Sequence, residues 1–275
     1  MVDFNRYLKS FEKARLSEMV CRRCWAHSKS ASGIDAFCNF CEQYIGTSGY
    51  GSLHNPEAEA VFLRLQGAAN RGLKPGDFAA LDALLKSNSD PRVLYVAGVF
   101  YALLSDSLYR SRDYGIPGFM EENSDNIRAS LDCSARSKAL FYEAIALAAR
   151  EPFPSDDSVE LLFMEFLCWI RLKRIADASR ALMQLHKLLK GGRTLDYADM
   201  VFSVESGAAD ADVRLGRLLS INEPNALYYL AKRLAKGKRI GEAQAVLGRL
   251  GRKANVPIAQ QLMNAVKEAQ DASRI

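Results

Sequence analysis

The sequence CRRC at residues 21–24 is followed, after a spacer of thirteen residues, by CNFC at residues 38–41. In each stretch two residues separate the cysteines, and this spacing lets one tight turn direct both sulfur atoms toward a single point. Two such pairs supply four thiolates, which is a ligand set of a tetrahedral metal ion. The spacing therefore predicts a metal site made of Cys21, Cys24, Cys38 and Cys41.

Zinc is the metal that this ligand set favours, with iron as the alternative. Knuckles that bind iron usually carry Pro and Gly beside the cysteines, and residues 21–25 contain neither. Four protein ligands leave no open position for water or substrate, so we expect a structural and not a catalytic Zn2+. A redox dithiol, or replacement of one thiolate by His27 or by His54, is a weaker alternative.

The residues around the cysteines predict the local structure of this module. Apolar side chains at three- to four-residue spacing predict a helix over residues 4–20. The spacer, residues 25–37, contains several Ser and a Gly, which indicates turns or a short hairpin. A short helix is expected at residues 42–45, as in treble-clef zinc modules. Three glycines in residues 46–51 indicate a linker, so we predict an N-terminal zinc module over residues 1–50.

From residue 55 onward the pattern is almost wholly helical. Asn55 followed by Pro56, and Asp90 followed by Pro91, are helix starts in which a capping side chain precedes a proline at the first helical position. A loop is expected over residues 110–126, which is long for a connection and is either functional or mobile.

An internal repeat occupies the second half of the chain. KRIADA at residues 173–178 recurs as KRIGEA at residues 238–243, and GAADA at residues 207–211 lies halfway between them. Each copy contains an alanine followed by leucines at plus four and plus seven: Ala178, Leu182, Leu185; Ala211, Leu215, Leu218; Ala243, Leu247, Leu250. The period of about 33 residues predicts two helices per unit, with the alanine allowing close helix approach and the leucines filling the neighbouring groove.

This pattern resembles tetratricopeptide repeats, a family of 34-residue helix-turn-helix units. The matching positions are Leu227, Leu230, Ala231, Leu234, Ala243, Leu247 and Leu250 in the last unit, and Phe202 and Ala211 in the middle unit. Asp199 in the middle unit and Phe166 in the first stand where that family has a small residue, and no unit ends with the family's proline. The resemblance covers residues 155–255, and residues 55–150 only through their helical-hairpin character.

We therefore predict a mostly α fold, with a small N-terminal four-cysteine zinc module of the zinc-ribbon or treble-clef kind. A superhelix of α-α hairpins resembling tetratricopeptide repeats follows over residues 55–275. The resemblance implies a scaffold or adaptor whose concave face holds a protein or peptide partner. The sequence contains no Gly-rich phosphate loop, nucleophile elbow or paired-histidine metal helix, so an enzyme is not indicated.

The charge distribution suggests an alternative function. The net charge is +5, but residues 225–275 contain ten Lys or Arg against three acids, a local charge of +7, and the rest of the chain sums to −2. A basic end of this kind is typical of proteins with an acidic partner, including nucleic acid. The residues assigned to partner or nucleic-acid contact are Arg22, Arg23, Lys232, Lys236, Lys238 and Arg239.

The cysteines also bear on the compartment and on the response to metal loss. Paired Cys-x-x-Cys spacing without a secretory signal indicates reduced thiols, which predicts the cytoplasm, and no apolar run is long enough to predict a membrane span. Cys133 and Cys168 are expected to be buried free thiols. We expect Cys38→Ser to unravel residues 18–46 and to leave most of the helical content in place.

Overall fold

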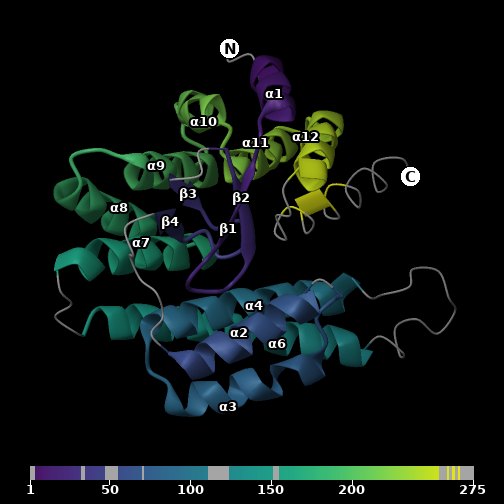
Figure 1. Ribbon diagram of the computed structural model, residues 1–275, viewed down its shortest axis with the longest axis vertical. Coiled ribbons are helices and arrows are strands. Elements are labelled where there is room, and N and C mark those ends of the chain that lie inside the picture. The colour runs from purple at the N-terminus through teal and green to yellow at the C-terminus, as the bar shows by residue number, and fades with distance from the viewer. Residues whose placement is uncertain are drawn as a thin grey trace, which may run out of the picture. The chain divides into compact units, whose positions relative to one another are not determined.

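The computed structural model describes residues 4–31, 35–46, 55–69, 71–110, 124–150 and 155–253, together with Ala259, Leu262, Met263 and Val266. It is mostly helical with a small cysteine-rich segment near the N-terminus, as predicted (Figure 1). The chain divides into two compact units. The first contains residues 1–21, 26–50 and 155–275, and the second contains residues 22–25 and 51–154. A boundary between independently folding domains at residues 50–55 stays a prediction.

Seven helices among the described residues of the first unit form its helical part. Their bounds are α1 Phe4–Lys13, α7 Ser155–Arg171, α8 Ile175–Leu188, α9 Arg193–Ser206, α10 Ala211–Ser220, α11 Pro224–Lys236 and α12 Ile240–Lys253. From α7 to α12 each helix packs against the next, and α9 also contacts both α7 and α11 (Figure 1). The first helices of the three hairpins, α7, α9 and α11, therefore lie side by side. Helix α1 packs against α10 and α12.

The alanines and leucines of the sequence repeat are buried at corresponding positions. Ala178, Ala211 and Ala243 lie in α8, α10 and α12, the second helix of each hairpin, and all three are fully buried. The leucines at plus four and plus seven are buried as well. The periodic residues thus form the contacts between successive helices, because a small side chain and two leucines recur on the same helix face.

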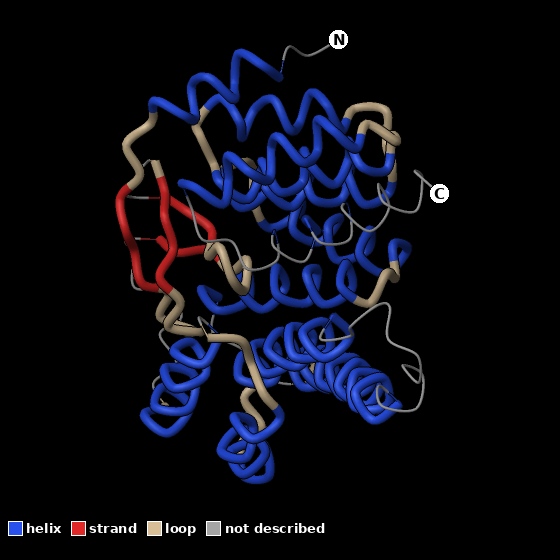
Figure 2. Tube along the Cα trace, turned by 90° about the vertical axis from the view of Figure 1, so that its right-hand side faces the viewer, coloured by secondary structure: helices blue, strands red, loops and turns tan. Residues whose placement is uncertain are grey.

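The described residues of the first unit also contain four short strands: β1 Ser17–Val20, β2 His27–Ser30, β3 Asp35–Phe37 and β4 Tyr44–Gly46. β1 pairs with β2 and β3 with β4, both antiparallel, and the strands gather in one place (Figure 2).

Three local predictions are therefore wrong. The helix from residue 4 ends at Lys13 and a strand follows, and residues 44–46 are a strand and not part of a helix. The spacer forms no hairpin of its own, because its strands β2 and β3 each pair with a strand outside it, across a cysteine turn.

The second unit contains α2 Pro56–Ala69, the 3-10 helix Pro75–Phe78, α3 Ala79–Ser87, α4 Pro91–Arg110 and α6 Ser124–Ala148. Both predicted starts are confirmed: Asn55 Oδ1 accepts the amide of Ala58 at 3.0 Å, and Asp90 Oδ1 accepts that of Arg92 at 2.8 Å. Most of the predicted linker and loop fall at residues 47–54 and 111–123, outside the described residues. In the part of the chain that is described, no helix combines the length and apolar character needed to cross a membrane.

Candidate metal centre

The two Cys-x-x-Cys stretches converge on one point. The Sγ atoms of Cys21, Cys24, Cys38 and Cys41 all lie within 4.8 Å of one another, and those of Cys21 and Cys41 are 3.8 Å apart. A tetrahedral ion with metal–sulfur distances of about 2.3 Å places its ligands about 3.8 Å apart. All four side chains are buried, with at most 1% of their surface exposed. The residues present therefore fit a four-thiolate metal site closed to solvent.

The two cysteine turns have matching backbone geometry. The amide of Cys21 donates to the carbonyl of Ala26 at 3.0 Å, and the amide of Cys38 donates to the carbonyl of Gln43 at 2.8 Å. The residue after the second cysteine is left-handed in both, with φ of 56° at Trp25 and 62° at Glu42. Each turn joins two antiparallel strands, so the module consists of two hairpins whose tips carry the ligands. The helix expected after the second cysteine pair is replaced by the strand β4.

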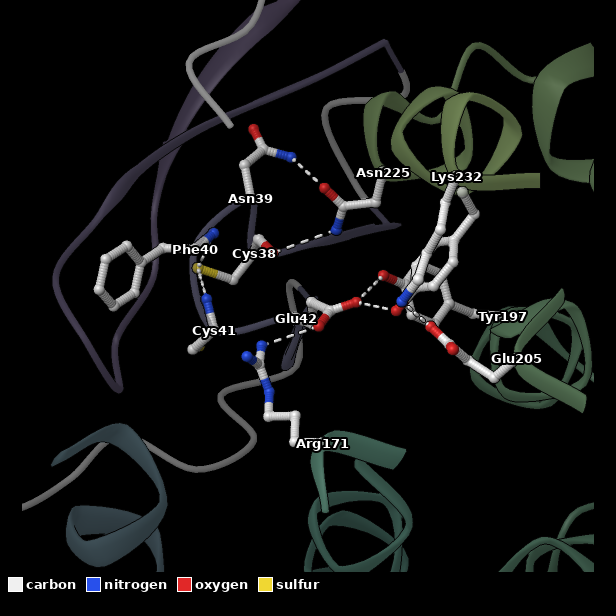
Figure 3. A network of polar contacts seen from close by, with 11 residues as sticks. Cys38, Asn39, Phe40, Cys41, Glu42, Arg171, Tyr197, Glu205, Asn225 and Lys232 are labelled. Carbon is white, nitrogen blue, oxygen red and sulfur yellow. Dashed lines mark hydrogen bonds and ion pairs between the residues drawn. The ribbon is translucent and has the colours of Figure 1, made fainter. Parts of the chain in front are cut away.

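Hydrogen-bond donors surround the sulfur of Cys38. The amides of Phe40 and Cys41 each lie 3.4 Å from this Sγ (Figure 3). The hydroxyl of Ser28 also donates to it, at 3.5 Å. Donors of this kind stabilise a thiolate, the form of cysteine that binds metal. Ser28, in β2, also accepts the amide of Asn39 at 3.0 Å, so one hydroxyl links the first hairpin to the second cysteine turn.

Two asparagines fasten the second cysteine turn to helix α11. Asn225 Nδ2 donates to the carbonyl of Cys38, and Asn39 Nδ2 donates to Asn225 Oδ1, both at 3.1 Å (Figure 3). Asn39 Oδ1 in turn accepts the amide of Lys29 at 2.7 Å. Both asparagines are buried and hydrogen-bonded through both ends of the amide, so the turn is held in one orientation at the start of α11.

Glu42 makes a second connection, to three helices at once. Its Oε2 lies 2.8 Å from Arg171 Nη2 of α7, and its Oε1 accepts the hydroxyls of Tyr197 of α9 at 2.9 Å and Tyr229 of α11 at 2.6 Å (Figure 3). The Glu42 side chain is 5% exposed and that of Arg171 is 13% exposed. The carboxylate is thus neutralised by a guanidinium and hydrogen-bonded on both oxygens, as a buried charge requires.

Burial shapes the electrostatics around these contacts. Loss of solvation raises the pKa of Tyr197 and of Tyr229 well above the ordinary value, and the neighbouring Glu42 carboxylate raises both further. Both tyrosines therefore remain hydroxyl donors. Burial also raises the pKa of Glu223, which precedes α11, to about 7. Glu205 has a lowered pKa because the lysine charges, first that of Lys232, outweigh its burial.

Within the second unit, residues 22–25 are held by α2. The Trp25 ring stacks on Phe62 with 6.4 Å between centroids, and Gln66 Nε2 donates to the carbonyl of Cys24 at 3.2 Å. These contacts fix the backbone of the first cysteine turn. The left-handed Trp25 is therefore supported by packing, as Glu42 is supported by ion pairing and hydrogen bonds.

The other residues predicted as metal ligands or as partner contacts lie partly in positions that do not suit those roles. His27 is exposed and pairs with Glu18 at 2.5 Å between Nδ1 and Oε1, away from the cysteine cluster, and His54 lies outside the described residues. Arg23 is buried, and the Lys232 side chain is 18% exposed and pairs with Glu205. The remaining basic residues of that set are exposed: Arg22, Lys236, Lys238 and Arg239. Cys168 is buried as predicted, whereas Cys133 is only partly buried.

Sequence reasoning missed the residues that hold the centre in place. Arg171, Tyr197, Tyr229 and Asn225 lie 129 to 187 positions from their partners at residues 38–42, so no local pattern marks them. One local feature stands out. The position after the second cysteine turn has a left-handed backbone, which glycine adopts without strain, and this chain has Glu42 there.

Fold and site together define a mostly helical protein with four buried cysteines placed so that they could hold a metal ion. Comparison of the chain with protein-family models, with curated proteins and with solved structures finds no match.

Proposed function

We propose that the four cysteines bind one structural Zn2+ in a non-catalytic helical scaffold. The observation that carries the proposal is the convergence of four buried sulfur atoms to within 4.8 Å of one another. With four protein ligands the ion has no open position, so its contribution is to folding and not to reaction chemistry. The burial of all four thiols also disfavours a redox role, because a thiol–disulfide partner cannot reach them.

Metal analysis of the full chain tests this proposal. We expect about one zinc per chain and a colourless protein, whereas a ferric tetrathiolate would be strongly coloured. Cys38→Ser should abolish stoichiometric binding because it removes one of four ligands. Cys133→Ser is the matched control, since this cysteine lies outside the cluster and is only partly buried. A wild-type protein that takes up no metal, or a Cys38→Ser protein that still binds stoichiometrically, would contradict the proposal.

We propose further that the scaffold binds a protein or peptide partner. The support is the tetratricopeptide-like register of the hairpins α7–α8, α9–α10 and α11–α12, whose repeat residues are buried at corresponding positions. In this chain residues 37–42 already contact α7, α9 and α11, so a partner must displace them or use other helices. Affinity capture from the native cell should recover one stoichiometric protein that stays bound at high salt.

Nucleic-acid binding is the alternative, and the exposed Lys236, Lys238 and Arg239 are what supports it. Its weakness is that Arg23 is buried and that three other members of the predicted set pair with acids: Lys232 and Lys236 with Glu205, and Arg239 with Glu242. Binding to phosphates would weaken steeply as salt rises, and replacing the three exposed residues would flatten that dependence. Absence of salt-sensitive binding to RNA or DNA would remove this alternative.

A further inference from the structure

Glu42 combines a strained backbone with a buried charge. Its φ of 62° is the left-handed conformation, which glycine adopts freely and other residues adopt at a cost. Its carboxylate is withdrawn from water, which is costly unless the charge is paired and hydrogen-bonded. The left-handed backbone and the buried charge are both unfavourable, so the contacts of the Glu42 side chain must offset both costs.

Those contacts come from three successive helices of the hairpin array. Arg171 is the last residue of α7, Tyr197 lies in the second turn of α9, and Tyr229 lies in the second turn of α11. The array therefore supplies one cation and two hydroxyl donors at the place where α7, α9 and α11 lie side by side (Figure 3). One carboxylate binds all three groups, and removing it would take away the partner that they share.

The same turn is fixed by two further contacts. The ring of Phe37 stacks on Tyr197 with 3.9 Å between centroids, and Asn225 holds the carbonyl of Cys38. Cys38 and Cys41 therefore sit on a segment whose position depends on the packing of the helices. The geometry that brings two of the four sulfurs to the site is set partly by residues of α7, α9 and α11.

We propose that Glu42 is a positioning residue that couples metal binding at the four cysteines to the packing of α7, α9 and α11. The proposal rests on the four-cysteine site being a metal site. Coupling of this kind is reciprocal: the helices raise the metal affinity to the same extent that the metal stabilises the helices. Groups that hold metal ligands from outside the ligand set commonly change metal affinity by ten- to a hundredfold when removed.

Glu42→Gly tests this proposal, because the direction of the change in unfolding temperature shows whether the side chain has a role. Glycine relieves the left-handed backbone, so if the side chain had no role the variant would unfold at a higher temperature than the wild type. We expect the opposite: a lower unfolding temperature in saturating Zn2+, and a zinc affinity weakened about tenfold or more, measured by competition with a chromophoric chelator. Lys238→Gly is the matched control, because Lys238 is an exposed residue with φ of 61°, and it should raise the unfolding temperature without changing zinc affinity.

Tyr229→Phe tests the coupling from the helical side. It removes one hydroxyl, keeps the ring, and lies 188 positions from Cys41 in the sequence. We expect zinc affinity to fall measurably, by about two- to tenfold, with the circular dichroism spectrum unchanged. Unchanged zinc affinity in both Glu42→Gly and Tyr229→Phe would overturn the proposal while leaving the metal site intact. Failure of the wild-type protein to bind Zn2+ would instead overturn the proposed function.

Discussion

Glu223 is a fully buried carboxyl group that precedes helix α11. Its Oε1 accepts the amide of Asn225 at 3.2 Å, the residue that also holds the carbonyl of Cys38. Burial raises the pKa of Glu223 to about 7, although that hydrogen bond and the charge of Arg193 both act to lower it. Loss of solvation therefore outweighs the favourable contacts, and ionisation of this group weakens the fold.

The sign of the pH effect follows from this raised pKa. The folded state holds the proton more tightly than the unfolded state, so stability from Glu223 is greatest below about pH 4.5 and falls as the pH rises toward about 7. We expect Glu223→Gln, which keeps an acceptor for Asn225 but cannot ionise, to be more stable than the wild type at pH 8 by about 2–3 kcal/mol.

The measurement is urea unfolding of both proteins with Zn2+ present, at pH 5 and at pH 8. At pH 5 the two free energies of unfolding should differ by less than about 1 kcal/mol, because Glu223 is then protonated in the folded state but already partly ionised in the unfolded state. Any loss of metal at the lower pH affects both proteins, so their difference reports Glu223. A difference of the same size at both pH values would show that ionisation of this group has no part in stability.

At the scale of single elements, α4 and α6 approach each other closely at Gly98. A Cβ atom added there would lie 2.7 Å from Cε1 of Phe141, and Ser137 Oγ donates to the carbonyl of Gly98 at 2.8 Å. Phe141 is 3% exposed and packs against Tyr95, so its ring has little room to move. The absence of a side chain at Gly98 is what allows the two helices to pack at this distance.

We expect Gly98→Ala to destabilise the protein by about 1–3 kcal/mol through overpacking. Gly67→Ala is the matched control in helix α2, where an added Cβ meets nothing within 4 Å, and it should stabilise by about 0.5–1 kcal/mol because alanine is the better helix former. Urea unfolding gives both free energies. If Gly98→Ala proved as stable as Gly67→Ala, the close approach would not limit the packing of α4 on α6.

The elements also show where sequence reasoning succeeds. The hairpins α7 to α12 were predictable because their cause is local and repeated: the small residue and leucines recur every turn or two within a helix. Ser17–Val20 and Tyr44–Gly46 were not, because each becomes a strand only through pairing across a cysteine turn. The apolar spacing that predicts a helix over residues 4–20 carries no information about that pairing.

The same distinction holds for the candidate site. The four ligands were predictable because the spacing within each Cys-x-x-Cys turn is itself the geometry of the site. Glu42, Asn39 and their helical partners were not, since the fold alone brings residues more than a hundred positions apart into contact.

At the scale of the whole molecule, Cys21, Cys38 and Cys41 belong to the same compact unit as the helices α7 to α12, whereas Cys24 belongs to the other unit. The sequence predicts that metal loss unravels only residues 18–46. The buried contacts of Glu42 and Asn39 with α7, α9 and α11 extend that expectation to the helices they touch. The packing of α4 against α6 depends on other contacts, such as the hydrogen bonds between Ser105 and Ser130.

We therefore expect chelation of the metal to affect the two units unequally. Hydrogen exchange should accelerate over residues 35–46 and over α9 and α11, while protection in α4 and α6 remains, because side chains of α9 and α11 bind residues of the second cysteine turn. Free Zn2+ at a thousandfold excess over its dissociation constant should add about 4 kcal/mol to the stability of the first unit, by mass action. Faster exchange confined to residues 18–46 would show that the module unfolds alone and that Glu42 transmits nothing to the helices. Equal acceleration in α4 and α6 would show instead that the chain unfolds as a single cooperative unit.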